Sequence, residues 1–298
     1  MSSAPESSGY ELPLHVEQYG AGDEQIMLLH GFAANSYTWR SWIGPLAKER
    51  RVWAVELKGH GSAPAPADDM YTLRDHADLV YHLILKNDIR RLTLVGHSMG
   101  GGVALLVALR LLEEERLERL ERLVLVSSAA YAQRLPLFIA LSARGRLSEW
   151  GLRLVPKRLL IRSVLRFFVV HDRRTITDGQ VTAYAEPLYS APHRTALIKT
   201  AAGMVPPDFA ELTRRFSGID VPTLLLWGRY DRVVPLDIGE RLFAALPRAQ
   251  LTIMECGHVP PEELPKESLE IVLEFLRGGV GDPSPETHDT TGPAKPDT

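Results

Sequence analysis

The chain has 298 residues, of which 45% are hydrophobic, and its formal net charge is −3. This length and apolar content suit one large α/β domain with a sizeable core, and the near-neutral charge argues against a nucleic-acid partner. Cys256 is the single cysteine, so an internal disulfide is excluded.

The two ends of the chain differ in composition from the rest. Residues 1–10 are rich in Ser and polar, and residues 278–298 hold almost no large apolar side chain. We expect both segments to be disordered. Residues 1–10 lack the apolar core of a signal peptide, and no stretch of the chain is apolar for long enough to span a membrane. We therefore expect a cytoplasmic protein.

Between the ends, apolar runs of strand length alternate with helical patterns. Strands are expected at residues 14–19, 25–29, 52–56, 92–95, 123–126, 221–228 and 249–254, the first of them antiparallel. Helices are expected at residues 73–85 and after Ser98, the latter running on to about residue 119. This alternation predicts an α/β fold with a mostly parallel sheet covered by helices on both faces.

The most informative motif is Gly-x-Ser-x-Gly at residues 96–100. It follows the apolar strand at 92–95 and precedes an apolar helical run. In the order strand, motif, helix, the serine lies on a sharp turn that lifts its hydroxyl above the edge of the sheet. The flanking glycines are needed because side chains there would collide with the neighbouring strand and helix. Ser98 is therefore predicted to be a nucleophile.

A nucleophilic serine needs a base and an acid that orients the base. In this arrangement they should follow in the order Ser, Asp, His, each after a strand. Asp231 follows the predicted strand at 221–228, and His258 follows the strand at 249–254. We predict Asp231 as the acid and His258 as the base. Ser127 and Ser128 stand where an alternative acid could follow the strand at 123–126, which favours Asp231.

The oxyanion site is predicted from backbone N–H groups. The loop His30-Gly31-Phe32 follows the early strand at 25–29. The N–H of Phe32 and the N–H of Met99, the residue after the nucleophile, should together face the negative oxygen of acyl transfer. His30 itself is expected to brace the loop rather than to act in catalysis. We expect no metal and no organic cofactor, because the sequence has no cluster of metal ligands and no phosphate-binding loop.

These motifs resemble those of the serine hydrolases of α/β-hydrolase fold. The resemblance spans residues 13 to 277 and rests on the loop at 30–32, the glycine-rich turn at 58–62, the motif at 96–101 and the segments at 227–231 and 257–260. It implies an eight-stranded sheet, with residues 11–130 and 217–277 forming the core. The family often has Asp where this chain has Glu56, a change expected to affect loop packing. Ser98 separates the chain from the related epoxide hydrolases and haloalkane dehalogenases, which have an aspartate there.

The resemblance also implies a helical cap over the site, at residues 131–216. This segment has fourteen Lys or Arg and six acidic residues. Phe167 and Phe168 are predicted on the apolar face of a helix after Pro156, as candidates to line the substrate pocket. The opposite face holds Arg158, Arg162 and Arg166. These arginines are expected in water, and the alternative is a surface that meets anionic lipid or guides an acidic substrate.

The expected function is hydrolysis of a small carboxylic ester through an acyl-enzyme. Several rivals use the same three residues: hydrolysis of a carbon–carbon bond in a diketone-like substrate, of a lactone or of an amide, and peroxidation without a cofactor. A different class is a ligand sensor that turns over slowly or not at all. The sequence does not give the acyl or alcohol group, because pocket shape sets it.

Overall fold

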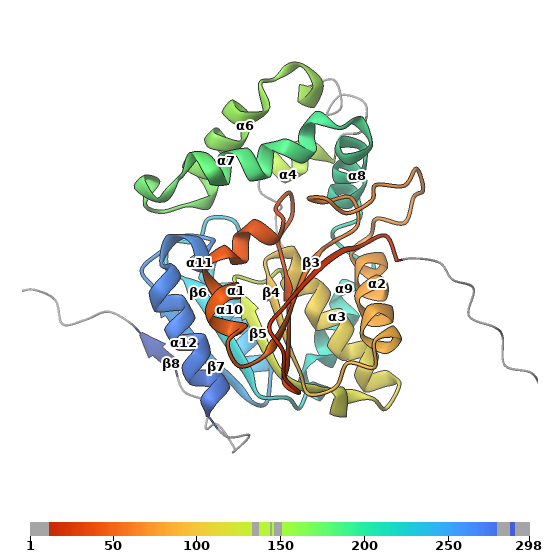
Figure 1. Ribbon diagram of the computed structural model, residues 1–298, viewed down its shortest axis with the longest axis vertical. Helices are drawn as coiled ribbons and strands as arrows, with labels where there is room; N and C mark the ends of the chain where they lie inside the picture. Colours follow the sequence, from red (N-terminus) through yellow and green to blue (C-terminus); the bar gives the residue numbers. More distant parts are fainter. Residues whose placement is uncertain (1–11, 133–136, 144, 146–150, 279–286, 290–298) are drawn as a thin grey trace, which may run out of the picture.

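The computed structural model describes residues 12–132, 137–143, 145, 151–278 and 287–289 (Figure 1). Within them, one sheet has the strand order β1-β3-β2-β4-β5-β6-β7-β8. The β1–β3 pair is antiparallel and all other neighbours are parallel. The strands are β1 (His15–Tyr19), β2 (Gln25–Leu29), β3 (Arg51–Glu56), β4 (Leu92–His97), β5 (Leu120–Val126), β6 (Thr223–Gly228), β7 (Ala249–Met254) and β8 (Thr287–Asp289). The predicted α/β class and the mostly parallel sheet are confirmed.

The central strands are apolar on both sides because the sheet is covered on both sides. Along β4, Leu92 and Leu94 join one buried cluster, while Val95 joins the cluster on the opposite face. The same alternation holds along β5, where Leu123 and Leu125 lie in the first cluster and Val124 and Val126 in the second. Successive side chains of a strand point to opposite faces, so continuous apolar runs are what a doubly covered parallel sheet requires.

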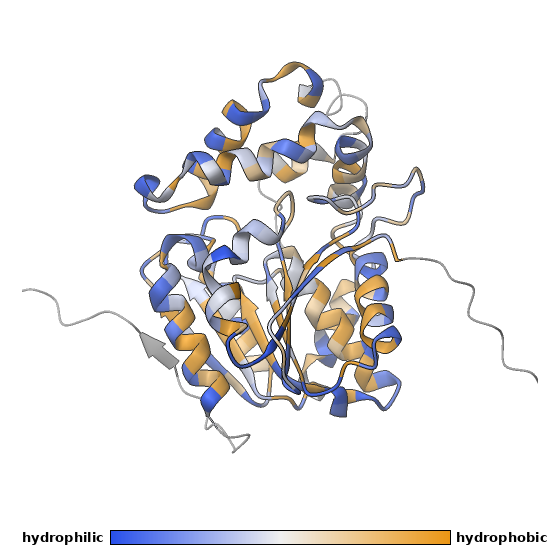
Figure 2. Ribbon diagram, in the orientation of Figure 1, coloured by the Kyte–Doolittle hydropathy of each residue, from blue (hydrophilic) through white to orange (hydrophobic). Residues whose placement is uncertain are grey.

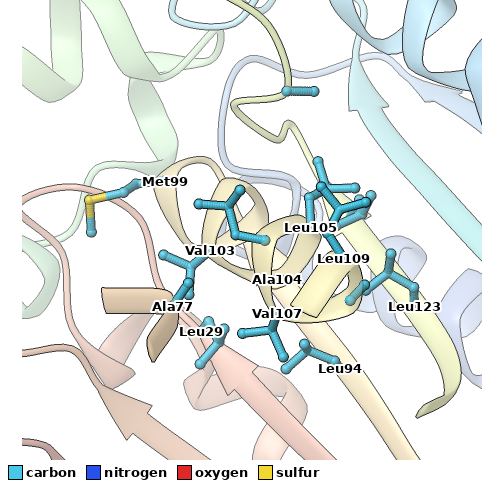
Figure 3. Close-up of a cluster of buried hydrophobic side chains, with 14 of the residues drawn as sticks. Leu29, Ala77, Leu94, Met99, Val103, Ala104, Leu105, Val107, Leu109 and Leu123 are labelled. Atoms are coloured by element: carbon cyan, nitrogen blue, oxygen red, sulfur yellow. The ribbon is translucent and has the colours of Figure 1, made fainter. Parts of the chain in front are cut away.

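Helices form the two covering layers. Side chains of α2 (Leu73–Lys86), α3 (Met99–Glu113), α9 (Phe209–Arg214) and α10 (Leu236–Ala245) belong to the first cluster. Those of α1 (Arg40–Leu46) and α12 (Pro265–Arg277) belong to the second, and the short α11 (Pro260–Glu263) lies beside them. Figure 3 shows Val107 of α3 near Leu29 and Leu94 of the sheet, and Val103 of α3 near Ala77 of α2. In Figure 2 the outward surfaces of these helices are polar, as amphipathic packing requires.

In the described part of residues 127–222, four helices lie together above the sheet (Figure 1). They are α4 (Leu137–Ser142), α6 (Lys157–Val164), α7 (Asp178–Ala185) and α8 (Ala191–Ala202), here called the cap helices. Ile161, Val181 and Leu197 form a small apolar cluster with Phe32 and its neighbours in the loop after β2. The cap helices therefore pack on the end of the sheet where the loops after β2 and β4 emerge.

Three expectations about the elements of the fold differ from the structure. The helix after Ser98 ends at Glu113, since Glu115 takes a left-handed conformation with φ 54° that stops it. Helix α9, expected in the cap, packs on the core through Phe209 and Leu212. The tail expected to be disordered contributes β8, which pairs with β7. The remaining tail residues, and residues 1–10, lie outside the described part of the chain.

The positive charge on the basic face of α6 is partly balanced by a carboxylate of the neighbouring cap helix α7. Arg162 forms an ion pair with Asp178 of α7, and Arg158 lies 3.9 Å from the same carboxylate. Arg166 lies over the ring of Phe167. These contacts give Arg158, Arg162 and Arg166 partners within the chain, and contact with a lipid surface stays the alternative to the predicted solvated face.

Candidate active site

Ser98 lies at the turn between β4 and α3 in a strained conformation. Its φ is 53° and its ψ is −118°, a region that side chains rarely occupy. The turn closes because its neighbours are glycines. A Cβ on Gly96 would lie 2.4 Å from the carbonyl oxygen of Gly100, and a Cβ on Gly100 would lie 2.4 Å from the carbonyl oxygen of Leu29. The glycines flanking Ser98 thus allow close contact with the helix and with β2, as the motif predicts.

Asp231 and His258 lie in hydrogen-bond contact on loops that follow β6 and β7. Asp231 Oδ2 accepts a hydrogen bond from His258 Nδ1 at 2.8 Å, and its Oδ1 accepts from the N–H groups of Val233 and Val234. Both side chains are nearly fully buried. With Nδ1 protonated, His258 Nε2 is left as the basic nitrogen. Ser98 and His258 line the same cavity. A hydrogen bond between such a pair often tightens only when substrate binds.

Two backbone N–H groups remain available beside Ser98. Neither the N–H of Phe32 nor that of Met99 makes a backbone hydrogen bond within the described residues. Met99 is the first residue of α3, so its N–H belongs to the positive end of the helix dipole. Gly31 lies against Ser98, since a Cβ there would be 3.1 Å from Ser98 Cβ. The loop after β2 and the start of α3 therefore meet at the serine.

The cavity has a volume of about 420 Å³ and walls that are mainly apolar. Helix α6 and the turn after it contribute Leu160, Ile161, Val164, Leu165 and Val169. The expected Phe167 and Phe168 are not part of its wall, and Phe167 is 54% exposed. The reason is a wider π-helical turn at Leu165–Val169, which rotates the later side chains away from a regular helical face.

Buried histidines support the loops around the site. His30 Nε2 accepts a hydrogen bond from the N–H of Leu57, and its Nδ1 contacts the carbonyl of Gly31, so the ring braces the loop as expected. His97, which the motif left unassigned, donates from Nε2 to the carbonyl of His258 at 2.9 Å. Burial lowers the pKa of His97 well below the usual value, and that of His30 to about 4. Both rings are therefore neutral at pH 7.

Glu56, which stands where the family often has Asp, holds two loops together. Its carboxylate accepts hydrogen bonds from the N–H and hydroxyl of Ser36 and from the N–H of Ser62. It thereby ties the glycine-rich turn to the short 3₁₀ helix at Ser36–Trp39, which is the packing role expected for it.

A second polar group on the cavity wall was missed by sequence reasoning. Thr38, Tyr184 and Glu262 line the cavity and come from three distant parts of the chain. No motif links them, because their contacts join residues 146 and 78 positions apart.

The described residues contain no group of three or more His, Cys, Asp or Glu that could hold a metal ion. Among them, no helix is both long and apolar enough to cross a membrane. The candidate site combines the Ser98 hydroxyl and the His258–Asp231 pair with two backbone N–H groups near the serine, beside a mainly apolar cavity.

Comparison with known proteins places the chain in a family. A model described as the alpha/beta hydrolase fold matches residues 25–265. The chain belongs to this family. The hydrolase is 28% identical over 272 residues to an uncharacterized hydrolase, YugF, from Bacillus subtilis (strain 168). The match covers 89% of this chain and 94% of the relative. The resemblance seen in the sequence is thereby confirmed.

Two further relatives have more specific names. The hydrolase is 30% identical over 281 residues to 2-hydroxymuconate semialdehyde hydrolase from Pseudomonas sp. (strain CF600), covering 91% of this chain and 92% of the relative. It also aligns with the structure of a meta-cleavage product hydrolase from Pseudomonas fluorescens IP01, at a TM-score of 0.71 and 27% identity. That match covers 88% of this chain and 93% of the other.

Proposed function

We propose that this hydrolase cleaves uncharged carboxylic esters through an acyl-enzyme formed on Ser98. The observation that carries the proposal is the lining of the cavity beside Ser98. Its described wall is mainly apolar and includes no Lys or Arg. A carboxylate on the substrate would lose its hydration there without meeting a cation, which is costly. An uncharged ester meets no such cost.

The proposed chemical steps assign one role to each group of the site. His258 Nε2 takes the proton of Ser98 as Oγ attacks the ester carbonyl, and Asp231 holds the imidazole in the required tautomer. The N–H groups of Phe32 and Met99 stabilise the oxyanion. His258 then protonates the leaving alcohol. Water, deprotonated by His258, attacks the acyl group and releases the acid and free Ser98.

A second candidate is hydrolysis of a carbon–carbon bond. It is favoured by the two relatives named as 2-hydroxymuconate semialdehyde hydrolase and meta-cleavage product hydrolase. A muconate derivative is a carboxylate, however, and the described wall of the present cavity offers it no Lys or Arg. We therefore rank ester hydrolysis first. A slow ligand sensor is the third candidate, and turnover number distinguishes it.

The test is steady-state kinetics on two substrate sets with wild type and Ser98→Ala. One set is nitrophenyl esters of graded acyl length, and the other is 2-hydroxymuconate semialdehyde with related ring-cleavage products. We expect many turnovers on esters and much lower kcat/KM on the second set, with both activities lost in Ser98→Ala. Higher kcat/KM on the ring-cleavage products would favour carbon–carbon hydrolysis. A single event per protein on every substrate would favour the sensor.

A further inference from the structure

Thr38, Tyr184 and Glu262 form a buried polar patch on the otherwise apolar cavity wall. Thr38 comes from the 3₁₀ helix after β2, Tyr184 from α7 of the cap, and Glu262 from α11. Thr38 is 1% exposed, Tyr184 is 7% exposed and the Glu262 side chain is 2% exposed. No hydrogen bond joins this patch to Ser98, His258 or Asp231 among the described residues. It is therefore a second polar feature of the same cavity.

The hydrogen bonds of the patch fix which atoms donate. Glu262 Oε2 accepts from Arg40 Nη1 at 2.7 Å and from Gln180 Nε2 at 2.9 Å. Burial raises the pKa of Glu262, but three donors, the Arg40 guanidinium among them, converge on its carboxylate and favour the ionised form. Tyr184 therefore donates its hydroxyl proton to Glu262 Oε1, at 2.5 Å. Since Tyr184 has no second proton, Thr38 Oγ1 donates to the Tyr184 oxygen at 2.8 Å.

Every hydroxyl proton of the patch is thus used within it. These three side chains line the cavity, and their remaining hydrogen-bonding capacity is lone pairs on Thr38 Oγ1, on the Tyr184 hydroxyl and on Glu262 Oε1. The two donors that neutralise Glu262, Arg40 and Gln180, do not line the cavity. A ligand reaching this wall therefore meets hydrogen-bond acceptors and finds no donor on these three side chains.

We propose that this acceptor patch selects substrates that carry a hydroxyl group away from the scissile ester. A hydroxyl group can donate a hydrogen bond to these acceptors. A carboxylate or a second carbonyl can only accept, and these three side chains offer it no donor. Arg40 already balances the charge of Glu262, so an uncharged hydroxyl fits better than an ammonium group. The inference deepens the proposed function and rests on it only in taking this cavity as the substrate site.

The test is calorimetric binding to Ser98→Ala protein, which cannot turn the ligands over. Four ligands differ in the terminal group alone: methyl hexanoate, methyl ω-hydroxyhexanoate, methyl ω-aminohexanoate and monomethyl adipate. We expect the hydroxy ester to bind about 5- to 10-fold more tightly than methyl hexanoate, as one added hydrogen bond gives. Monomethyl adipate should bind most weakly. Equal affinity of the hydroxy and plain esters, or tightest binding by the ammonium or carboxylate ligand, would overturn the inference.

Variants in the same Ser98→Ala background connect the preference to the patch. Thr38→Val keeps the shape but removes one of the three acceptor oxygens, and should lower the affinity ratio of hydroxy to plain ester. Thr38→Ser restores the oxygen and should restore the ratio. Thr182→Val, an exposed threonine on α7, is the matched control and should leave it unchanged. An undiminished ratio in Thr38→Val would also overturn the inference.

A second substitution tests whether the wall acts through its acceptors. Glu262→Gln places an N–H donor on the wall and should raise the affinity for monomethyl adipate relative to methyl hexanoate. No change in that ratio would count against the inference. Tyr184→Phe, which removes both a donor and an acceptor, replaces Thr38→Val if the valine variant does not fold by circular dichroism. Because the readout is binding, absence of ester turnover in the wild type would contradict the proposed function alone.

Discussion

At the scale of single residues, two hydrogen bonds fix the position of His258, one at its ring and one at its backbone carbonyl. Its Nδ1 is held by Asp231, and its backbone carbonyl accepts the Nε2–H of His97. The rings of His97 and His258 lie 4.7 Å apart, centre to centre. Because His97 is neutral, it does not repel the positive charge that His258 gains during catalysis, as a second cation at this distance would.

Substitution of Asp231 tests the orientation of His258. Asp231→Asn keeps one oxygen for the N–H groups of Val233 and Val234, but its NH₂ group opposes the proton on His258 Nδ1. The wrong tautomer should lower kcat on a nitrophenyl ester by about 10⁴-fold. The exposed Asp237→Asn should retain the wild-type rate. A wild-type rate in Asp231→Asn would place the orienting acid elsewhere.

The residues that sequence could predict are those whose chemistry demands a fixed local context. Ser98, Asp231 and His258 each follow a strand in a set order, so local patterns suffice to propose them. Thr38, Tyr184 and Glu262 carry no such pattern, because residues far apart in the sequence come together only in the tertiary structure. Their hydrogen bonds depend on tertiary packing, which no local spacing encodes.

At the scale of elements, helix α6 and the turn after it decide the shape of the cavity. The apolar period of a regular helix puts Phe167 on the same face as Val164. The π-helical turn at Leu165–Val169 breaks that period, so Val164, Leu165 and Val169 face the cavity while Phe167 is exposed. The strands, by contrast, were predictable within a few residues because each apolar run is bounded by loop residues.

A change of size at Val164 should alter substrate selectivity. Val164→Phe narrows the cavity, and should lower kcat/KM for an octanoyl ester relative to an acetyl ester by about tenfold, since contacts of a few methylenes are worth that much. Phe167→Ala, on the exposed side, is the control and should leave the ratio as in the wild type. The reverse result, with Phe167→Ala changing the ratio and Val164→Phe not, would mean that the cavity wall is wrongly assigned.

At the scale of the whole molecule, several histidines are buried in the loops that join the sheet to the site. The ring centres of His30 and His60 lie 5.4 Å apart, and those of His60 and His76 lie 5.9 Å apart. Burial lowers the pKa of His30 to about 4 and those of His60 and His76 to about 3. These rings therefore stay neutral in the folded protein under mildly acidic conditions.

This burial predicts a loss of stability in acid. Below pH 6.5 these histidines bind protons in the unfolded chain but not in the folded protein. The free energy of unfolding therefore falls as the pH falls from about 6.5 toward the pKa values of the folded protein, about 3 to 4. At pH 5 each of the three contributes a loss of roughly 2 kcal/mol. Urea unfolding at pH 7 and pH 5 measures it. His76→Leu should reduce the loss, and the exposed His82→Asn should not; equal stability at both pH values would refute the prediction.

The central claim is that an ester acylates Ser98, and mass spectrometry of the trapped intermediate tests it most directly. The protein is mixed with a nitrophenyl ester, quenched in acid within the first turnovers and digested, and the peptides are mapped. We predict one acyl group per molecule, on the peptide that contains Ser98, and no adduct in Ser98→Ala. Turnover of the ester with no adduct on Ser98, or undiminished turnover by Ser98→Ala, would contradict the account.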